Sequence, residues 1–262
     1  MQLFKFCKPE HNINKGAKLQ IGTLYGYRKI ENLELRDEHE GVYHFTIDFP
    51  QEITLDRQWS NLLFQGAINF GGRDETPRLP GDMNAEITKL HVVAQTGNHV
   101  IVKDTSVKIT RNINNCLIFC MSLLDAPEAK PFEGYNDHWS VALQNTNDFS
   151  QRLGSLIFQQ ANLSLFEGLG LSDHTPASLR RLGIHVRHKK VTYRDRHIVI
   201  TKDNIPKYEE ILETLSDIAF VKPERFNKES EYRFIFELND GRRSFSPKTE
   251  NLLLTLNPFF DL

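Results

Sequence analysis

The sequence predicts an α+β protein, because its strand and helix patterns neither alternate regularly nor separate into two halves. Short apolar runs, some with two-residue alternation, are typical of strands, and two longer segments space their apolar residues as on one face of a helix. The 262 residues fit one large domain or two small ones. We expect a single domain over residues 1–262, with a β-rich excursion at 66–111.

The first half of the chain has mainly strand patterns. In order, these occupy residues 3–7, 19–27, 43–49, several pieces within 85–110, and the nearly all-apolar run 116–124. Residues 96–98 and 103–105 suit turns between the pieces. Residues 31–40 hold five acids and one arginine, which favours an exposed loop or helical turn.

The second half adds the helices. Residues 149–158 carry apolar side chains at helical spacing, and residues 205–220 form the clearest amphipathic pattern, with Pro206 suited to its first turn. A last strand is expected at 232–238, ended by a turn at 239–241.

The composition indicates a soluble cytoplasmic protein. Three cysteines are too few for a secreted disulfide scaffold, and no apolar stretch is long enough for a membrane span or a signal peptide. The net charge of −2 excludes a globally basic nucleic-acid binder but not a local basic face.

Two glutamates, Glu229 and Glu231, stand directly before the last strand. In an extended backbone they project from the same side. Paired carboxylates there can bind a ribose diol and stabilise positive charge at its anomeric carbon. The alternative is a solvated charge run before a strand.

A basic segment at 180–197 holds seven Lys or Arg and three His residues. It could bind nucleic acid or a phosphate-bearing ligand, with Arg187, Lys189, Lys190 and Arg194 as candidate contacts. The alternative is a solvated strand edge, where basic side chains discourage aggregation.

His138 and Trp139 lead into another short apolar run and could line a ligand pocket, although a tryptophan that closes the core edge is an equally ordinary explanation. Cysteine spacing does not match a zinc site, so no metal is expected. No phosphate-binding loop with Gly-Lys-Ser/Thr occurs, nor a Gly-x-Ser-x-Gly motif.

Several short motifs in this order resemble two families. One is a bacterial domain-of-unknown-function family that begins with Leu-Tyr-Lys-Tyr, and the other is the ADP-ribosyltransferase superfamily. The matching pieces are Leu3-Phe-Lys-Phe6, Phe119-Cys-Met-Ser122, Tyr135-Asn-Asp-His-Trp-Ser-Val141, Lys190-Val-Thr-Tyr193 and Glu229-Ser-Glu-Tyr-Arg233. The resemblance implies a split mixed β-sheet with flanking helices.

The resemblance also implies site residues. Glu231 would be the catalytic glutamate, Glu229 would orient or deprotonate the acceptor, and Ser122 would support Glu231. NAD would be the co-substrate. Further residues implied around NAD are Lys5, Arg28, Tyr25 and His138. Lys5 replaces the family's first-strand Arg or His and lacks the bidentate fork of Arg.

The resulting hypothesis is an NAD-dependent ADP-ribosyltransferase acting on a macromolecule. The acceptor could be RNA, DNA or protein, in a bacterial toxin or antiphage defence setting with an antitoxin or regulatory partner and no membrane. The alternative is a non-catalytic nucleic-acid-binding defence or sensor protein that uses the 180–197 segment. A Mg²⁺-dependent nuclease is a third, less supported interpretation.

Overall fold

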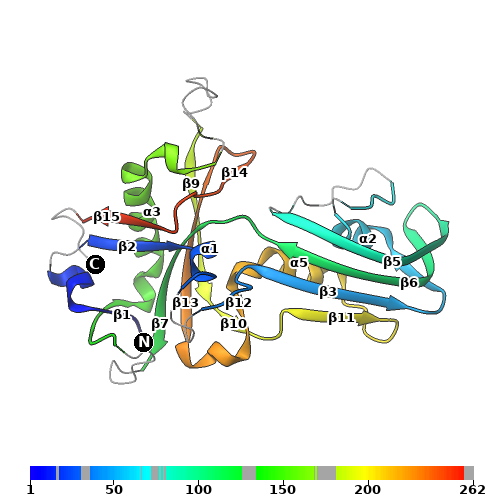
Figure 1. The fold of residues 1–262 in the computed structure, drawn as a ribbon, viewed down its shortest axis with the longest axis horizontal. Coiled ribbons are helices and arrows are strands. Elements are labelled where there is room, and N and C mark those ends of the chain that lie inside the picture. Colours follow the sequence, from blue (N-terminus) through cyan, green and yellow to red (C-terminus); the bar gives the residue numbers. More distant parts are fainter. Residues whose placement is uncertain are drawn as a thin grey trace. The chain divides into compact units, whose positions relative to one another are not determined.

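The computed structural model describes residues 1–15, 18–30, 36–65, 67–71, 77, 79, 81–125, 134–167, 169 and 181–256. It confirms the α+β class, with strands and helices mixed along the chain (Figure 1). In the described part of the chain, no helix is both long and apolar enough to cross a membrane.

The chain divides into two compact units. Unit 1 comprises 1–40, 115–193 and 222–262, and unit 2 comprises 41–114 and 194–221. We expected one domain with an excursion at 66–111. Unit 2 is larger than that excursion. The strand expected at 43–49 and the helix expected at 205–220 share a core with the excursion rather than with unit 1.

Unit 1 is built on a sheet that gathers strands from distant parts of the sequence. Its strands are β1 (Gln2–Cys7), β2 (Lys18–Thr23), β7 (Leu117–Leu124), β8 (Asp137–Ala142), β9 (Gly183–Lys190), β13 (Glu231–Asn239), β14 (Ser244–Phe245) and β15 (Asn251–Thr255). Every pairing between its described strands is antiparallel, so this sheet is not mixed as the resemblance implied.

The sheet divides along one edge of β7. The other edge of β7 pairs with β13. On the divided edge, β2 pairs with residues 117–118 and β1 with residues 122–124, so residues 119–121 pair with neither strand. The Lys5 ammonium lies in this interval and donates to the Cys120 carbonyl at 2.9 Å. It thereby satisfies a backbone acceptor that the strand ladder leaves open.

One face of the unit 1 sheet packs against helix α3 (Thr146–Gln160). Alternating aromatic residues of β13, Phe234 and Phe236, meet Phe149 and Leu153 of α3 in one apolar cluster. Alternation sends the odd-numbered residues of β13, including Glu231 and Arg233, to the other face. The polar site described below lies on that other face.

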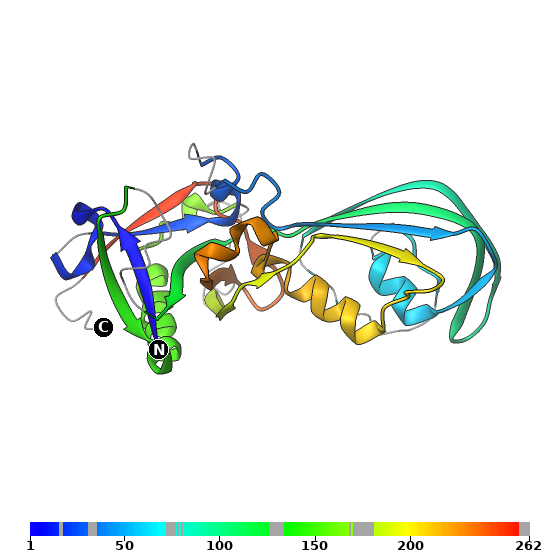
Figure 2. The same cartoon turned by 90° about the horizontal axis from the view of Figure 1, so that it is seen from below.

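Unit 2 is a second sheet with its own core. Its elements are β3 (Val42–Phe49), β4 (Ile53–Asp56), α2 (Arg57–Leu63), β5 (Asp82–Gln95), β6 (His99–Asn112), β11 (His197–Thr201) and α5 (Tyr208–Ser216). Figure 2 shows α2 and α5 on the same side of these strands. Side chains of both helices pack with Phe45, Ile47, Val107 and Ile109.

Three expected elements differ in their boundaries. The strand expected at 19–27 ends at Thr23, whose hydroxyl caps the short helix α1 (Leu24–Tyr27). Residues 103–105 interrupt β6 as a bulge rather than a turn, with Asp104 at a positive φ of 43°. Helix α5 begins after Lys207 because Glu210 bonds the Lys207 amide, so Pro206 precedes the helix.

Gly154 allows α3 to approach the sheet closely. A Cβ at Gly154 would lie 2.9 Å from a methyl of Val186 on β9, whereas a Cβ at Gly183 would meet nothing within 4 Å. We expect Gly154→Val to lower the free energy of unfolding by about 1–3 kcal/mol through overpacking. Urea unfolding would measure it, with Gly183→Val as the control. An equal loss in both variants would contradict the close approach.

Candidate functional site

The site lies where β13 begins, on the face of the sheet away from α3. Glu231 is 4% exposed and Arg233 is 2% exposed, so both charged side chains are buried. Burying charge costs several kcal/mol per ion unless opposite charges and hydrogen bonds compensate it. Glu231 and Arg233 therefore need charged partners and hydrogen bonds within the protein.

Both carboxylate oxygens of Glu231 accept hydrogen bonds from cations. Arg233 Nε donates to Oε1, and Lys222 Nζ donates to Oε2 at 2.9 Å. The Glu231 backbone N–H donates to the Tyr193 hydroxyl at 2.7 Å. Lys222 belongs to the short strand β12 (Val221–Lys222), which pairs with β10 (Thr192–Tyr193).

Glu229 shares the same lysine. Lys222 Nζ donates to Glu229 Oε2 at 2.6 Å, and Glu229 is only 3% exposed. Between the two glutamates, Ser230 takes a left-handed conformation with φ 43° and ψ 46°, which is costly for a residue with a Cβ. This turn brings both carboxylates to one ammonium group.

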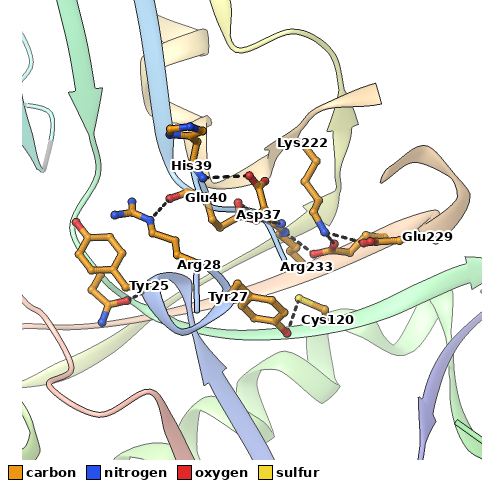
Figure 3. Close-up of polar contacts among 12 residues, drawn as sticks. Tyr25, Tyr27, Arg28, Asp37, His39, Glu40, Cys120, Lys222, Glu229 and Arg233 are labelled. Atoms are coloured by element: carbon orange, nitrogen blue, oxygen red, sulfur yellow. Dashed lines mark hydrogen bonds and ion pairs between the residues drawn. The ribbon is translucent and has the colours of Figure 1, made fainter. Parts of the chain in front are cut away.

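Arg233 extends the charge cluster to Glu40. Its two terminal nitrogens donate to the two oxygens of Glu40 at 2.8 and 3.0 Å, a bidentate pair (Figure 3). Glu40 is fully buried, and its amide bonds the Asp37 carbonyl in a tight turn. We define the charge cluster as Glu40, Lys222, Glu229, Glu231 and Arg233.

In the described part of the 31–40 segment, Glu38 and His39 are exposed as expected, but two of the acids are not. Asp37 and Glu40 are buried, because Arg233 offers Glu40 a charged partner and the Asp37 carboxylate accepts the His39 amide. Residues 31–35 of that expectation lie outside the described residues.

The charge cluster holds three acids and two cations, and its two neighbouring glutamates respond in opposite directions. Burial raises the pKa of Glu229 to about 7, with Lys222 opposing the shift and Glu231 adding to it. Burial alone would raise the pKa of Glu231 too, but Arg233 and Lys222 outweigh it and hold that pKa well below its ordinary value. A proton on Glu229 makes the charge cluster electrically neutral.

One carboxylate oxygen of the two glutamates makes no hydrogen bond to the described residues. Glu229 Oε1 is buried and has no hydrogen-bond partner among the described residues. An ionised carboxylate beside a carboxyl that titrates near neutrality can divide the work of charge stabilisation and proton transfer. The arrangement suits cleavage of a glycosidic bond at a centre that develops positive charge.

Ser122 is buried on β7. It is directly opposite Glu231 across the β7–β13 pair, and opposite residues in an antiparallel pair share a face. Lys5 is different: it lies opposite Trp139 on the α3 side of the sheet, with its ammonium 4.8 Å from the Phe119 ring centroid. Burial lowers the pKa of Lys5, and nearby Cys120 and Glu231 partly offset this.

Tyr25 and Arg28 form a second small group beside Glu40. The Arg28 guanidinium lies 3.9 Å from the centroid of the Tyr25 ring, and Arg28 Nε donates to the Glu40 carbonyl at 2.7 Å. Asn115 Oδ1 accepts the Tyr25 amide at 2.9 Å. Figure 3 shows Arg28 between Tyr25 and Glu40.

His138 shares a face with Ser122, but its strand β8 is the third strand from β13, with β7 and β1 between them. Its ring packs near Phe4 and Phe6, with centroids 5.8 and 6.1 Å apart. Trp139 is 2% exposed and stacks on Phe119, as expected for a tryptophan that closes the core. The structure does not bring His138 together with the charge cluster.

The basic segment does not form one patch in the described structure, and Arg180 lies outside the described residues. Arg187 and Lys189 share the face of Arg233, whereas Lys190 faces the α3 side. Arg194 belongs to unit 2, where it donates to Thr214 at 3.3 Å. The strand alternation of β9 separates residues that are neighbours in the sequence.

Sequence reasoning assigned no role to Glu40 or Lys222. A usable signal existed for Lys222, because it is the one charged residue in the otherwise apolar run 218–223. Glu40 directly precedes Gly41, which takes a positive φ of 72°, but nothing local links it to Arg233, 193 residues away. In the described part of the chain, no three His, Cys, Asp or Glu side chains are grouped as a metal ion would need.

Comparisons of the chain with protein-family models, with curated proteins and with solved structures found no match.

Arg233 neutralises two buried acids, so its removal should be costly. We expect Arg233→Met to lower the free energy of unfolding by about 3–5 kcal/mol, because Glu40 and Glu231 lose their shared partner. Arg243 pairs with Asp240 at the surface and is 59% exposed, so Arg243→Met should change stability by less than about 1 kcal/mol. Denaturant unfolding compares the two, and similar small losses would contradict the role of Arg233.

Proposed function

We propose that the chain is an NAD-dependent ADP-ribosyltransferase whose reacting groups are Glu231 and Glu229. The observation that carries the proposal is the geometry of two buried carboxylates that share the Lys222 ammonium, an arrangement that shifts their pKa values in opposite directions. The split of the sheet beside β7 and the Glu231–Ser122 pairing agree with the resemblance in the sequence. An ADP-ribosyltransferase-like fold, with an antiparallel rather than a mixed sheet, is part of this proposal.

Glu231 would supply the permanent negative charge. Its low pKa keeps it ionised, so it can stabilise the cationic ribose that forms as nicotinamide leaves. Glu229 would accept the proton of the attacking group, because a base with a pKa near 7 is ionised in part and still basic at neutral pH. The C1′–nicotinamide bond breaks, and a bond from C1′ to the acceptor forms.

Two basic residues could receive the diphosphate of NAD. Lys189 lies opposite Arg233 on the same face, and Arg187 lies two residues earlier on that face. Lys5 is less suited to this task, because its side chain leaves β1 on the α3 side of the sheet and its ammonium donates to the Cys120 carbonyl. Arg187 also forms an ion pair with Glu237 at 3.5 Å. Arg28 remains a further candidate through its stacked position beside Tyr25.

Burial sets a requirement on this proposal. Both oxygens of Glu231 are occupied by Arg233 and Lys222, so the ribose hydroxyls must replace one of these contacts or approach through Glu229 Oε1. Replacing a hydrogen bond of Glu231 by one from a ribose hydroxyl costs less free energy than leaving the carboxylate oxygen without a partner.

The setting of this activity is part of the proposal. The acceptor would be RNA, DNA or protein, and a toxin or antiphage role would bring an antitoxin or regulatory protein. The three cysteines are free, which is compatible with a reducing cytoplasm.

The direct test incubates the protein with NAD and RNA, DNA or protein acceptors, and measures nicotinamide release and adduct mass. We expect Glu231→Gln to reduce the rate at least ~100-fold, because the charge that stabilises the transition state is lost. Glu250→Gln is the matched control, since Glu250 pairs with Lys29 at the surface.

Growth inhibition in cells should accompany the assay, because a toxin can require a cellular activator. Absence of nicotinamide release and of Glu231-dependent toxicity would contradict the proposal. Salt-sensitive nucleic-acid binding that Arg187, Lys189 and Lys190 support, without NAD cleavage, would favour the non-catalytic alternative.

A further inference from the structure

The chain passes between unit 1 and unit 2 four times, and each crossing carries a unit 1 residue with defined polar contacts. The crossings lie at 40/41, 114/115, 193/194 and 221/222. The unit 1 residues at these crossings, which we call the anchor residues, are Glu40, Asn115, Tyr193 and Lys222.

Three anchor residues contact the Glu229–Glu231 segment or Arg233 directly. Glu40 forms the bidentate pair with Arg233, and Tyr193 accepts the Glu231 amide. Lys222 binds both glutamates. The residues that hold these carboxylates thus also fix the ends of the segments that lead into unit 2.

The fourth anchor residue is linked to the same network through Tyr25 and Arg28. Asn115 accepts the Tyr25 amide, and its amide group donates to the Pro247 carbonyl at 2.9 Å. Arg28 stacks on Tyr25 and bonds the Glu40 carbonyl. A disturbance of the charge cluster can therefore reach all four crossings by contiguous contacts.

The proton on Glu229 decides whether the charge cluster is balanced. Lys222 from β12, Glu231 from β13 and the Tyr193 phenol from β10 face Glu229 or its lysine, with Arg233 and Glu40 beyond them. Without the proton, three anions share two cations in a buried place. Uncompensated buried charge is relieved by water entry or by loosening of the contacts around it.

We propose that Glu229 is a proton-controlled latch on the anchor residues: the protonated carboxyl keeps them fixed, and the ionised carboxylate loosens them. The latch goes beyond the proposed function, because it needs neither NAD nor an acceptor. A ligand that donates a hydrogen bond or a cation to Glu229 Oε1 would act on the same latch.

The test is amide hydrogen exchange of the full chain at pH 6 and pH 8, corrected for the intrinsic pH dependence of exchange. We expect peptides covering 36–45, 190–196 and 219–232 to lose at least about tenfold protection at pH 8. Glu229→Gln, which mimics the neutral acid, should keep that protection at both pH values. Glu250→Gln should behave as wild type.

A second variant keeps the test decisive if Glu229→Gln fails to fold. Glu40→Gln removes one anion, so the charge cluster is neutral with Glu229 ionised, and the loss of protection at pH 8 should disappear. Protection that is independent of pH in wild type would overturn the latch. So would the same pH dependence in wild type and in the folded variants.

Discussion

The Arg233 guanidinium, bonded to Glu40 on one side and Glu231 on the other, is the contact on which the rest of the site depends. Without it, Glu40 would lose its bidentate partner and Glu231 one of its two cations, and Lys222 alone could not balance three acids. Because Arg233 fixes Glu231 in the ionised form, the remaining proton of the charge cluster belongs to Glu229. The side chains that stabilise the buried charge cluster are thus the same ones that would take part in the proposed reaction.

The same contact explains why a polar face can be buried in an antiparallel sheet. Phe234 and Phe236 supply apolar packing against α3 on one face of β13, while Glu231 and Arg233 on the other face are compensated by charge. Buried ion networks contribute less to stability than apolar packing of equal volume. Their retention at one end of a strand beside a left-handed Ser230 is typical of a functional site.

Local patterns predicted much of the fold, because alternation marks β3, a nearly all-apolar run marks β7, and helical spacing marks α3 and α5. Glu229 and Glu231 were also found from the sequence, since they immediately precede a strand. The Glu40–Arg233 pair could not be found, because it joins residues 193 positions apart. The extent of unit 2 was missed for the same reason: β3 and β11 pair across a long sequence separation.

Both the proposed chemistry and the latch require the Glu229 carboxyl to hold its proton near neutral pH. The most direct measurement is a ¹³C NMR titration of glutamate side-chain carboxyls in the full chain, with Glu229→Gln used for assignment. We expect one signal with a midpoint near pH 7 that is absent from the variant, and a second buried carboxyl that stays ionised throughout. Titration of every glutamate near its ordinary pKa of about 4.3 would contradict it.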